Sequence, residues 1–237
     1  MMQPEIGGAL PSARYYRRIT RRLGLATAAQ LKQITRPLLE LDPRFVLVKR
    51  WLVIRPVGHW LHGYFLDRRS GKGVFVVQAS VIPLYFKRRI TPHWDVHPPP
   101  SAGTPGGWHA TTPYVDRHLI EIMAGSASDA VTRYDSPDKF LALLHREVGV
   151  WEEKIHTLAL AGRLRHAIRF AEKLIVRYRN PPGGYAPYFK HIRRLQRLIA
   201  VFRGGQAPTN RLLRTFEWIN VRRLGVEQWW TWTPLAT

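Results

Sequence analysis

Cationic side chains recur at helical spacing in the C-terminal third of the chain. Lys190, Arg193 and Arg197 fall at i, i+3 and i+7 on one face of an expected helix, with Arg194 beside them. The expected helix before it carries further cations on its polar side: Arg163, Arg165, Arg169, Lys173 and Arg177. A guanidinium group donates two parallel hydrogen bonds and stays charged at physiological pH, which suits phosphate. The two faces are candidate anion-binding surfaces; the alternative is that each is an ordinary solvated face.

Two further basic groups extend this prediction toward the N-terminus. One is an arginine patch on an expected helix that Ser12 caps and Gly24 ends, formed by Arg17, Arg18, Arg21 and Arg22. The other is the run Lys87, Arg88 and Arg89. Aromatic residues lie among the basic ones in residues 49–51, 86–89, 185–190 and 214–218. Such rings stack on bases in single-strand binders, although aromatic residues more often belong to the core.

Histidine and aspartate residues offer the alternative of enzyme chemistry. His93, Asp95 and His97 alternate along the chain, so an extended backbone would place them on one side, where they suit zinc, manganese or iron. His109, Asp116 and His118 are further candidates, but the spacing matches no established metal signature, so a metal-free polar cluster is the default. His59 and His62 are candidates for general acid and base catalysis. Three residues apart on a strand, they are expected on opposite faces, so no catalytic residue is assigned.

The charge of the whole chain supports an anionic partner. Its 237 residues carry a formal net charge of +21, with 29 Arg and 8 Lys. The charge is +12 over residues 1–100, −2 over residues 101–150 and +11 over residues 151–237, which predicts two positive surfaces or one composite surface. The absence of cysteine excludes disulfides, Cys-ligated zinc and thiol catalysis. No nucleotide-binding or nucleophile motif is present, and no cofactor is expected.

The pattern of apolar residues predicts an α+β fold. Thr27 and Gln30 form a capping box that opens a helix over residues 27–41, which Pro37 should kink or split. Three strands rich in β-branched and aromatic residues then predict an antiparallel meander, with a possible fourth later: residues 44–55, 59–67 and 74–86. The link over residues 68–73 has hairpin length. Residues 87–113 are a loop dense in Pro and Gly, and residues 114–124 are either a strand or a helix.

The remainder of the chain predicts a bundle of about four helices. Ser136 caps the first, which Pro137 opens and which runs through Val148 or on to Leu158. Three more follow over residues 161–179, 188–202 and 209–224, the last ended by Gly225. The aromatic tail over residues 227–232 should pack back on the body. The expected organisation is residues 1–113 and residues 114–237, as one continuous domain or two tightly packed ones.

The order of elements over about residues 27–90 also resembles that of a known domain family. A helix, the segments 44–55 and 59–67, and a strand that contains Val77 and Gln78 and ends in Pro83, Leu84 and Tyr85 follow one another here. This order resembles an uncharacterised bacterial α+β domain that recurs among hypothetical and defence-associated proteins, over about residues 27–90. The resemblance implies a binding or immunity-type module and supplies no active-site residues.

The sequence thus predicts a non-enzymatic, arginine-rich binding protein that contacts nucleic acid, DNA or RNA, or another polyanion, alone or as a subunit of a larger complex. The first alternative is an immunity-type partner of an acidic protein. The second is a metal-dependent hydrolase or nuclease using His93, Asp95 and His97. No transmembrane segment is expected, because no run approaches about 18 apolar residues, and the bacterial cytoplasm is the expected location.

Overall fold

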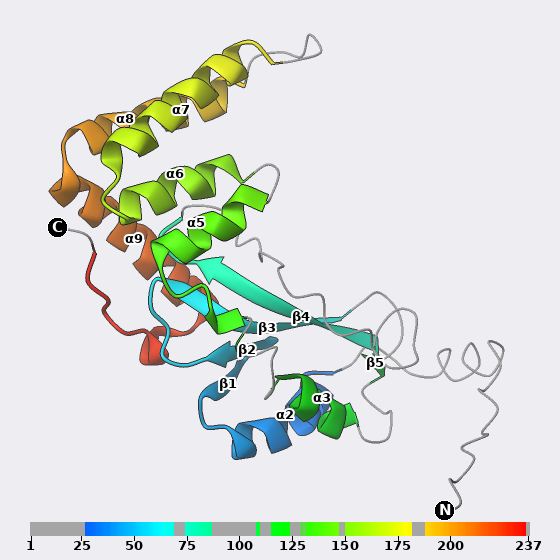
Figure 1. Cartoon of the computed structure of the whole chain (residues 1–237). Helices are drawn as coiled ribbons and strands as arrows, with labels where there is room; N and C mark the ends of the chain where they lie inside the picture. Colours follow the sequence, from blue (N-terminus) through cyan, green and yellow to red (C-terminus); the bar gives the residue numbers. More distant parts are fainter. Residues whose placement is uncertain are drawn as a thin grey trace, which may run out of the picture.

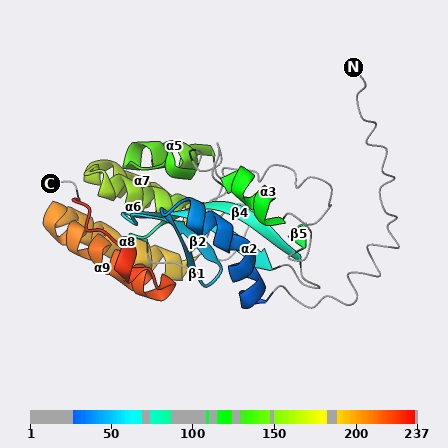
Figure 2. The ribbon, with the colours of Figure 1, turned by 90° about the horizontal axis from the view of Figure 1, so that it is seen from below.

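A central antiparallel sheet packs against helices on both of its faces in this computed structural model (Figures 1 and 2). The structure describes residues 27–68, 74–86, 108–109, 115–123, 129, 131–146, 150–181 and 188–235. Helices α2 (Ala28–Leu41) and α3 (Val115–Met123) pack side by side on one side of the molecule. The C-terminal helices gather on the other side (Figure 1). The predicted α+β class is confirmed.

The sheet is a meander in which every described neighbour is antiparallel. Its strands follow in the order β1 (Phe45–Val48), β2 (Trp51–Ile54), β3 (Trp60–Arg68), β4 (Val74–Pro83) and β5 (Trp108–His109). The prediction of one strand over residues 44–55 is wrong, because Val48 pairs with Trp51 across a tight turn. Lys49 occupies the left-handed region of that turn, with φ of 58°. Lysine and arginine carry no turn signature, which is why the hairpin was missed.

Side chains alternate between two hydrophobic clusters, one on each face of the sheet. Leu52, Tyr64 and Val77 belong to the larger cluster, which joins the sheet to α2, α3 and most of the C-terminal helices. Val53 and Leu61 belong to the smaller one, which the end of the last helix covers. The sheet is therefore buried on both faces, and the C-terminal helices are held against it.

Helix α2 begins as the sequence predicts. The Thr27 hydroxyl accepts a hydrogen bond from the Gln30 amide at 3.2 Å, and the Gln30 side chain accepts one from the Thr27 amide at 2.8 Å. The helix runs through Pro37 without splitting. The open alternative for residues 114–124 resolves to a helix, α3.

Five helices follow in the described C-terminal part of the chain: α5 (Pro137–Arg146), α6 (Trp151–Leu160), α7 (Leu164–Arg179), α8 (Phe189–Arg203) and α9 (Gln206–Leu224). The predicted continuation of the first helix to Leu158 is wrong. A separate helix begins at Trp151. Glu152 and Glu153 favour a helix start there, because negative side chains near the N-terminus interact favourably with the positive end of the helix dipole. No helix in the described part of the chain is long and apolar enough to cross a membrane.

The chain end packs back on the sheet, as predicted. Gly225 ends α9 in the left-handed conformation, with φ of 78°. After the short 3-10 helix Glu227–Trp229, the Val57 amide donates to the Trp229 carbonyl, and the Thr231 amide donates to the Val57 carbonyl. These bonds fix the aromatic tail beside the turn that precedes β3.

Candidate anion-binding pocket

Helix α8 presents a row of exposed cations because most of its apolar residues are buried on the opposite face. Its buried residues repeat at intervals of one, three and four: Ile192, Leu195, Leu198, Ile199 and Phe202. Lys190, Arg193 and Arg197 fall on the remaining face and are exposed. Among the residues that the structure describes, no ion pair holds any of these three cations. Their charges are therefore available to an anion.

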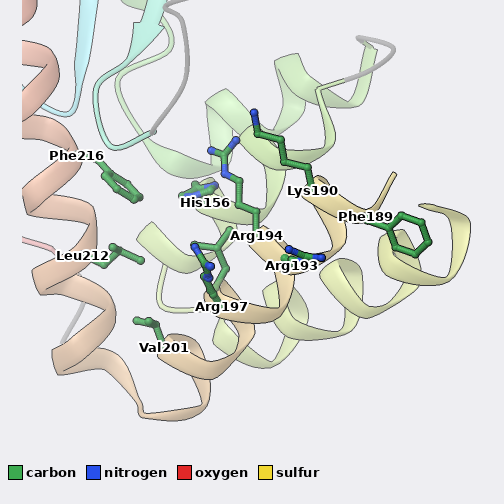
Figure 3. Close-up of a pocket in the computed structure, with 10 residues that line it drawn as sticks. His156, Phe189, Lys190, Arg193, Arg194, Arg197, Val201, Leu212 and Phe216 are labelled. Atoms are coloured by element: carbon green, nitrogen blue, oxygen red, sulfur yellow. The ribbon is translucent and has the colours of Figure 1, made fainter. Parts of the chain in front are cut away.

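A pocket of about 640 Å³ opens beside these cations, between α8 and α9 (Figure 3). Helix α9 contributes apolar walls through Leu212 and Phe216, and α6 contributes His156, which lies between Arg194 and Phe216 in the close-up. The complete lining is His156, Phe189, Lys190, Arg193, Arg194, Arg197, Leu198, Val201, Leu212 and Phe216. The pocket thus combines a cationic edge with an apolar interior, within the usual size range of ligand pockets, about 300–1,000 Å³.

Arg194 differs from its neighbours because a buried carboxylate fixes it. Its guanidinium lies 2.8 Å from Oε2 of Glu152, whose side chain is only 2% exposed. His191 approaches the other carboxylate oxygen at 3.3 Å. The Arg194 guanidinium also lies over the Phe86 ring, 5.7 Å from its centroid. Arg194 therefore links α8 to α6. Its charge is neutralised by Glu152, so its main role at the pocket is structural.

His156 is fully buried at the pocket and carries one unpaired nitrogen. Nδ1 lies 2.8 Å from the main-chain carbonyl of Glu152, and a carbonyl only accepts, so Nδ1 bears the proton. Nε2 is then an acceptor, and it has no hydrogen-bond partner among the described residues. Burial, with a further contribution from the Arg194 charge, lowers the pKa of His156 to about 4. The ring is therefore neutral near neutral pH and presents a lone pair.

The structure brings together only part of the predicted basic surface. Arg193, Arg194 and Arg197 line one pocket with Lys190. Arg165 and Arg169 are exposed on α7 and do not line it, and Arg163 pairs with Asp138 at 2.6 Å. The other cationic candidates lie outside the described residues: Arg17, Arg18, Arg21, Arg22, Lys87, Arg88 and Arg89.

The predicted metal ligands His93, Asp95 and His97 also lie outside the described residues. The backbone of the other candidates is described, but their side chains are not: His109 in β5, and Asp116 and His118 in α3. Within the part of the chain that is described, no group of three or more His, Asp or Glu side chains could hold a metal ion.

His59 and His62 line one pocket of about 480 Å³, although opposite faces were expected. Strand alternation does not apply to His59, because β3 begins only at Trp60. His59 lies with Nδ1 2.5 Å from Glu217 and Nε2 3.1 Å from the Pro234 carbonyl. Nε2 of His62 is 3.0 Å from the Tyr134 carbonyl. Both rings hold chain segments together through these contacts.

Sequence reasoning missed His156 and the α9 wall formed by Leu212 and Phe216. Each looks like an ordinary residue of an amphipathic helix, and the three meet only because α6 and α9 pack against each other. The spacing of residues within one helix does not predict a contact between two helices. The exposed cations of α8, in contrast, follow from a single helical repeat.

The fold and site define an α+β protein with an arginine-lined pocket between two C-terminal helices. Comparison with known proteins adds no family to that description: no protein-family model, curated protein or solved structure matches the chain. Because one fold can host many functions, the function has to be inferred from the pocket itself.

Proposed function

We propose that this protein binds nucleic acid without acting as an enzyme, and that α8 contacts the phosphates. The single observation that carries the proposal is the row of exposed cations formed by Lys190, Arg193 and Arg197, which no described carboxylate neutralises. Uncompensated charges on one face repel one another, and a phosphate backbone relieves that repulsion while releasing counterions. Contacts of this kind supply affinity and leave base sequence largely unread.

Aromatic residues beside the cations favour nucleic acid over polyanions without bases. Phe189 is 62% exposed and Tyr188 is 46% exposed, at the start of the helix that carries the cations. Exposed rings next to basic residues are typical of single-strand binding surfaces, where each stacked base contributes about 1–3 kcal/mol. A sulfated polysaccharide would use the cations but has no bases to stack on these rings.

The test is the salt dependence of binding to a fluorescent single-stranded oligonucleotide. Replacing Arg193 and Arg197 by glutamine should weaken binding and flatten the slope of log K against log salt by about 1.4, or about 0.7 for each lost phosphate contact. The matched control is the double replacement Arg165→Gln and Arg169→Gln, which removes the same charge from the exposed face of α7.

The control separates a local site from bulk charge. If the α7 control flattens the slope as much as the α8 variant does, attraction is general and α8 is not the site. If the wild-type protein binds the oligonucleotide with no dependence on salt, or does not bind it at all, the proposal fails.

A further inference from the structure

The pocket beside α8 contains a second feature that phosphate binding does not use. Nε2 of His156 is a buried acceptor without a partner among the described residues, while Nδ1 is already committed to the Glu152 carbonyl. Buried polar atoms in native proteins are almost always paired, and each exception calls for an explanation such as a ligand. A group that donates a hydrogen bond would complete this site, whereas a phosphate oxygen, which only accepts, would not.

The surroundings of His156 suit a flat aromatic ligand. The Phe86 and Phe216 rings lie with centroids 5.0 and 6.0 Å from that of His156. Leu212 and Val201 add apolar wall, and most of the pocket's interior is apolar. A heteroaromatic ring with one donor group fits these surroundings, because its faces are apolar and its edge is polar.

The cations and the acceptor lie in different parts of the pocket. Lys190, Arg193 and Arg197 line the α8 side of the pocket, where a phosphate would lie. His156 lies across from them, toward α9 (Figure 3). We infer that the pocket takes one unstacked base of a bound strand, and that the base donates an exocyclic amine to Nε2 of His156.

The inference rests on the proposed function and deepens it: the protein holds the strand by phosphate and selects an amine-bearing base. Adenine, cytosine and guanine carry such an amine; uracil and thymine do not. The His156 ring has no exposed surface, so the base reaches it only as the covering side chains shift.

The experiment compares short single strands that differ by the amine alone. Each of three pairs is measured by fluorescence anisotropy: adenine against purine, cytosine against 2-pyrimidinone, and guanine against hypoxanthine. Loss of one hydrogen bond should weaken wild-type binding about three- to tenfold for at least one pair. The difference should vanish in His156→Phe, which keeps an aromatic ring and removes the acceptor. It should return in His156→Gln, whose side-chain carbonyl can accept in place of Nε2.

A second variant keeps the inference testable if His156→Phe does not fold. Leu212→Trp fills the pocket from α9 and leaves His156 unchanged, and it should abolish the amine preference. Circular dichroism and thermal unfolding establish that each variant is folded.

Four results would overturn the inference. The first is equal affinity within all three pairs. The second is an amine preference that persists in both His156→Phe and Leu212→Trp. The third is equal affinity for the mononucleotide and the strand, which would assign the pocket to a free nucleotide. A strand of abasic sites that binds as tightly as the intact strand, with the same salt slope, would leave phosphate binding intact and remove only the base site.

Discussion

Acidification should destabilise the protein well above the pH at which carboxylates are protonated, because two histidines, buried His156 and half-buried His62, are neutral in the folded chain. Burial lowers the pKa of both His62 and His156 from 6.5 to about 4. Between these values the unfolded chain binds protons that the folded chain rejects, so stability falls as pH falls. The stabilising contribution is complete above pH 6.5 and is lost as pH approaches 4.

The magnitude follows from the two pKa values. At pH 5 each ring should contribute about 2 kcal/mol less to the free energy of unfolding than at pH 8, and the pair about 4 kcal/mol less. That is a large share of the total of about 5–15 kcal/mol expected for a folded domain. The charges around the rings do not cancel the effect. Asp135 raises the pKa of His62 and Glu152 raises that of His156, but burial outweighs both, and Arg194 lowers the pKa of His156 further.

Urea denaturation followed by tryptophan fluorescence, at about pH 8 and about pH 5, measures the effect. The variants His62→Gln and His156→Gln remove the titrating group while keeping an amide that can donate to the carbonyl that each ring faces. Each variant should lose about 2 kcal/mol less than the wild type on acidification, and the double variant should lose least. Parallel curves for wild type and variants over this range would refute the reasoning.

Two substitutions test how the fold is held together, by the same denaturation assay. Glu217→Ala removes a buried carboxylate that lies 2.7 Å from Arg214, and it should lower the free energy of unfolding by about 3–5 kcal/mol. Glu172→Ala breaks an exposed pair and should lower it by less than about 1 kcal/mol. Equal losses in the two variants would contradict the role of the buried pair. Gly63→Ala would place a Cβ atom 2.0 Å from the Leu52 carbonyl oxygen, so the variant should lose more than about 2 kcal/mol, and wild-type stability would disprove the close approach.

The parts of the fold that sequence could predict are those that depend on near neighbours. The capping box of Thr27 and Gln30 needs residues three apart, and the structure forms it. The positive φ that ends α9 needs only Gly225. The exposed row on α8 needs one helical repeat. Each of these patterns spans a few residues, so no tertiary information is required to recognise it.

The parts that sequence could not predict are contacts between distant segments. His59 meets Glu217 across 158 positions, and no local pattern pairs a residue before β3 with one inside α9. The Lys49 turn was missed for a different reason: unbroken apolar runs lie on both sides of it, and lysine tolerates the left-handed conformation without favouring it. The pocket wall likewise depends on helix packing, which is set by the whole core.

Burial of acidic side chains makes the surface of the C-terminal part more positive than its net charge indicates. Residues 151–237 contain five acidic residues. Three of them are buried, namely Glu152, Glu153 and Glu217. Glu152 pairs with Arg194, and Glu217 pairs with Arg214, so these carboxylates neutralise cations in the interior and leave none of their charge for the surface. The exposed face of α8 is therefore more positive than the net charge of residues 151–237 suggests, because most of the carboxylates in that part of the chain are buried. Under the proposed function, the anionic partner displaces the counterions that otherwise balance Arg193 and Arg197.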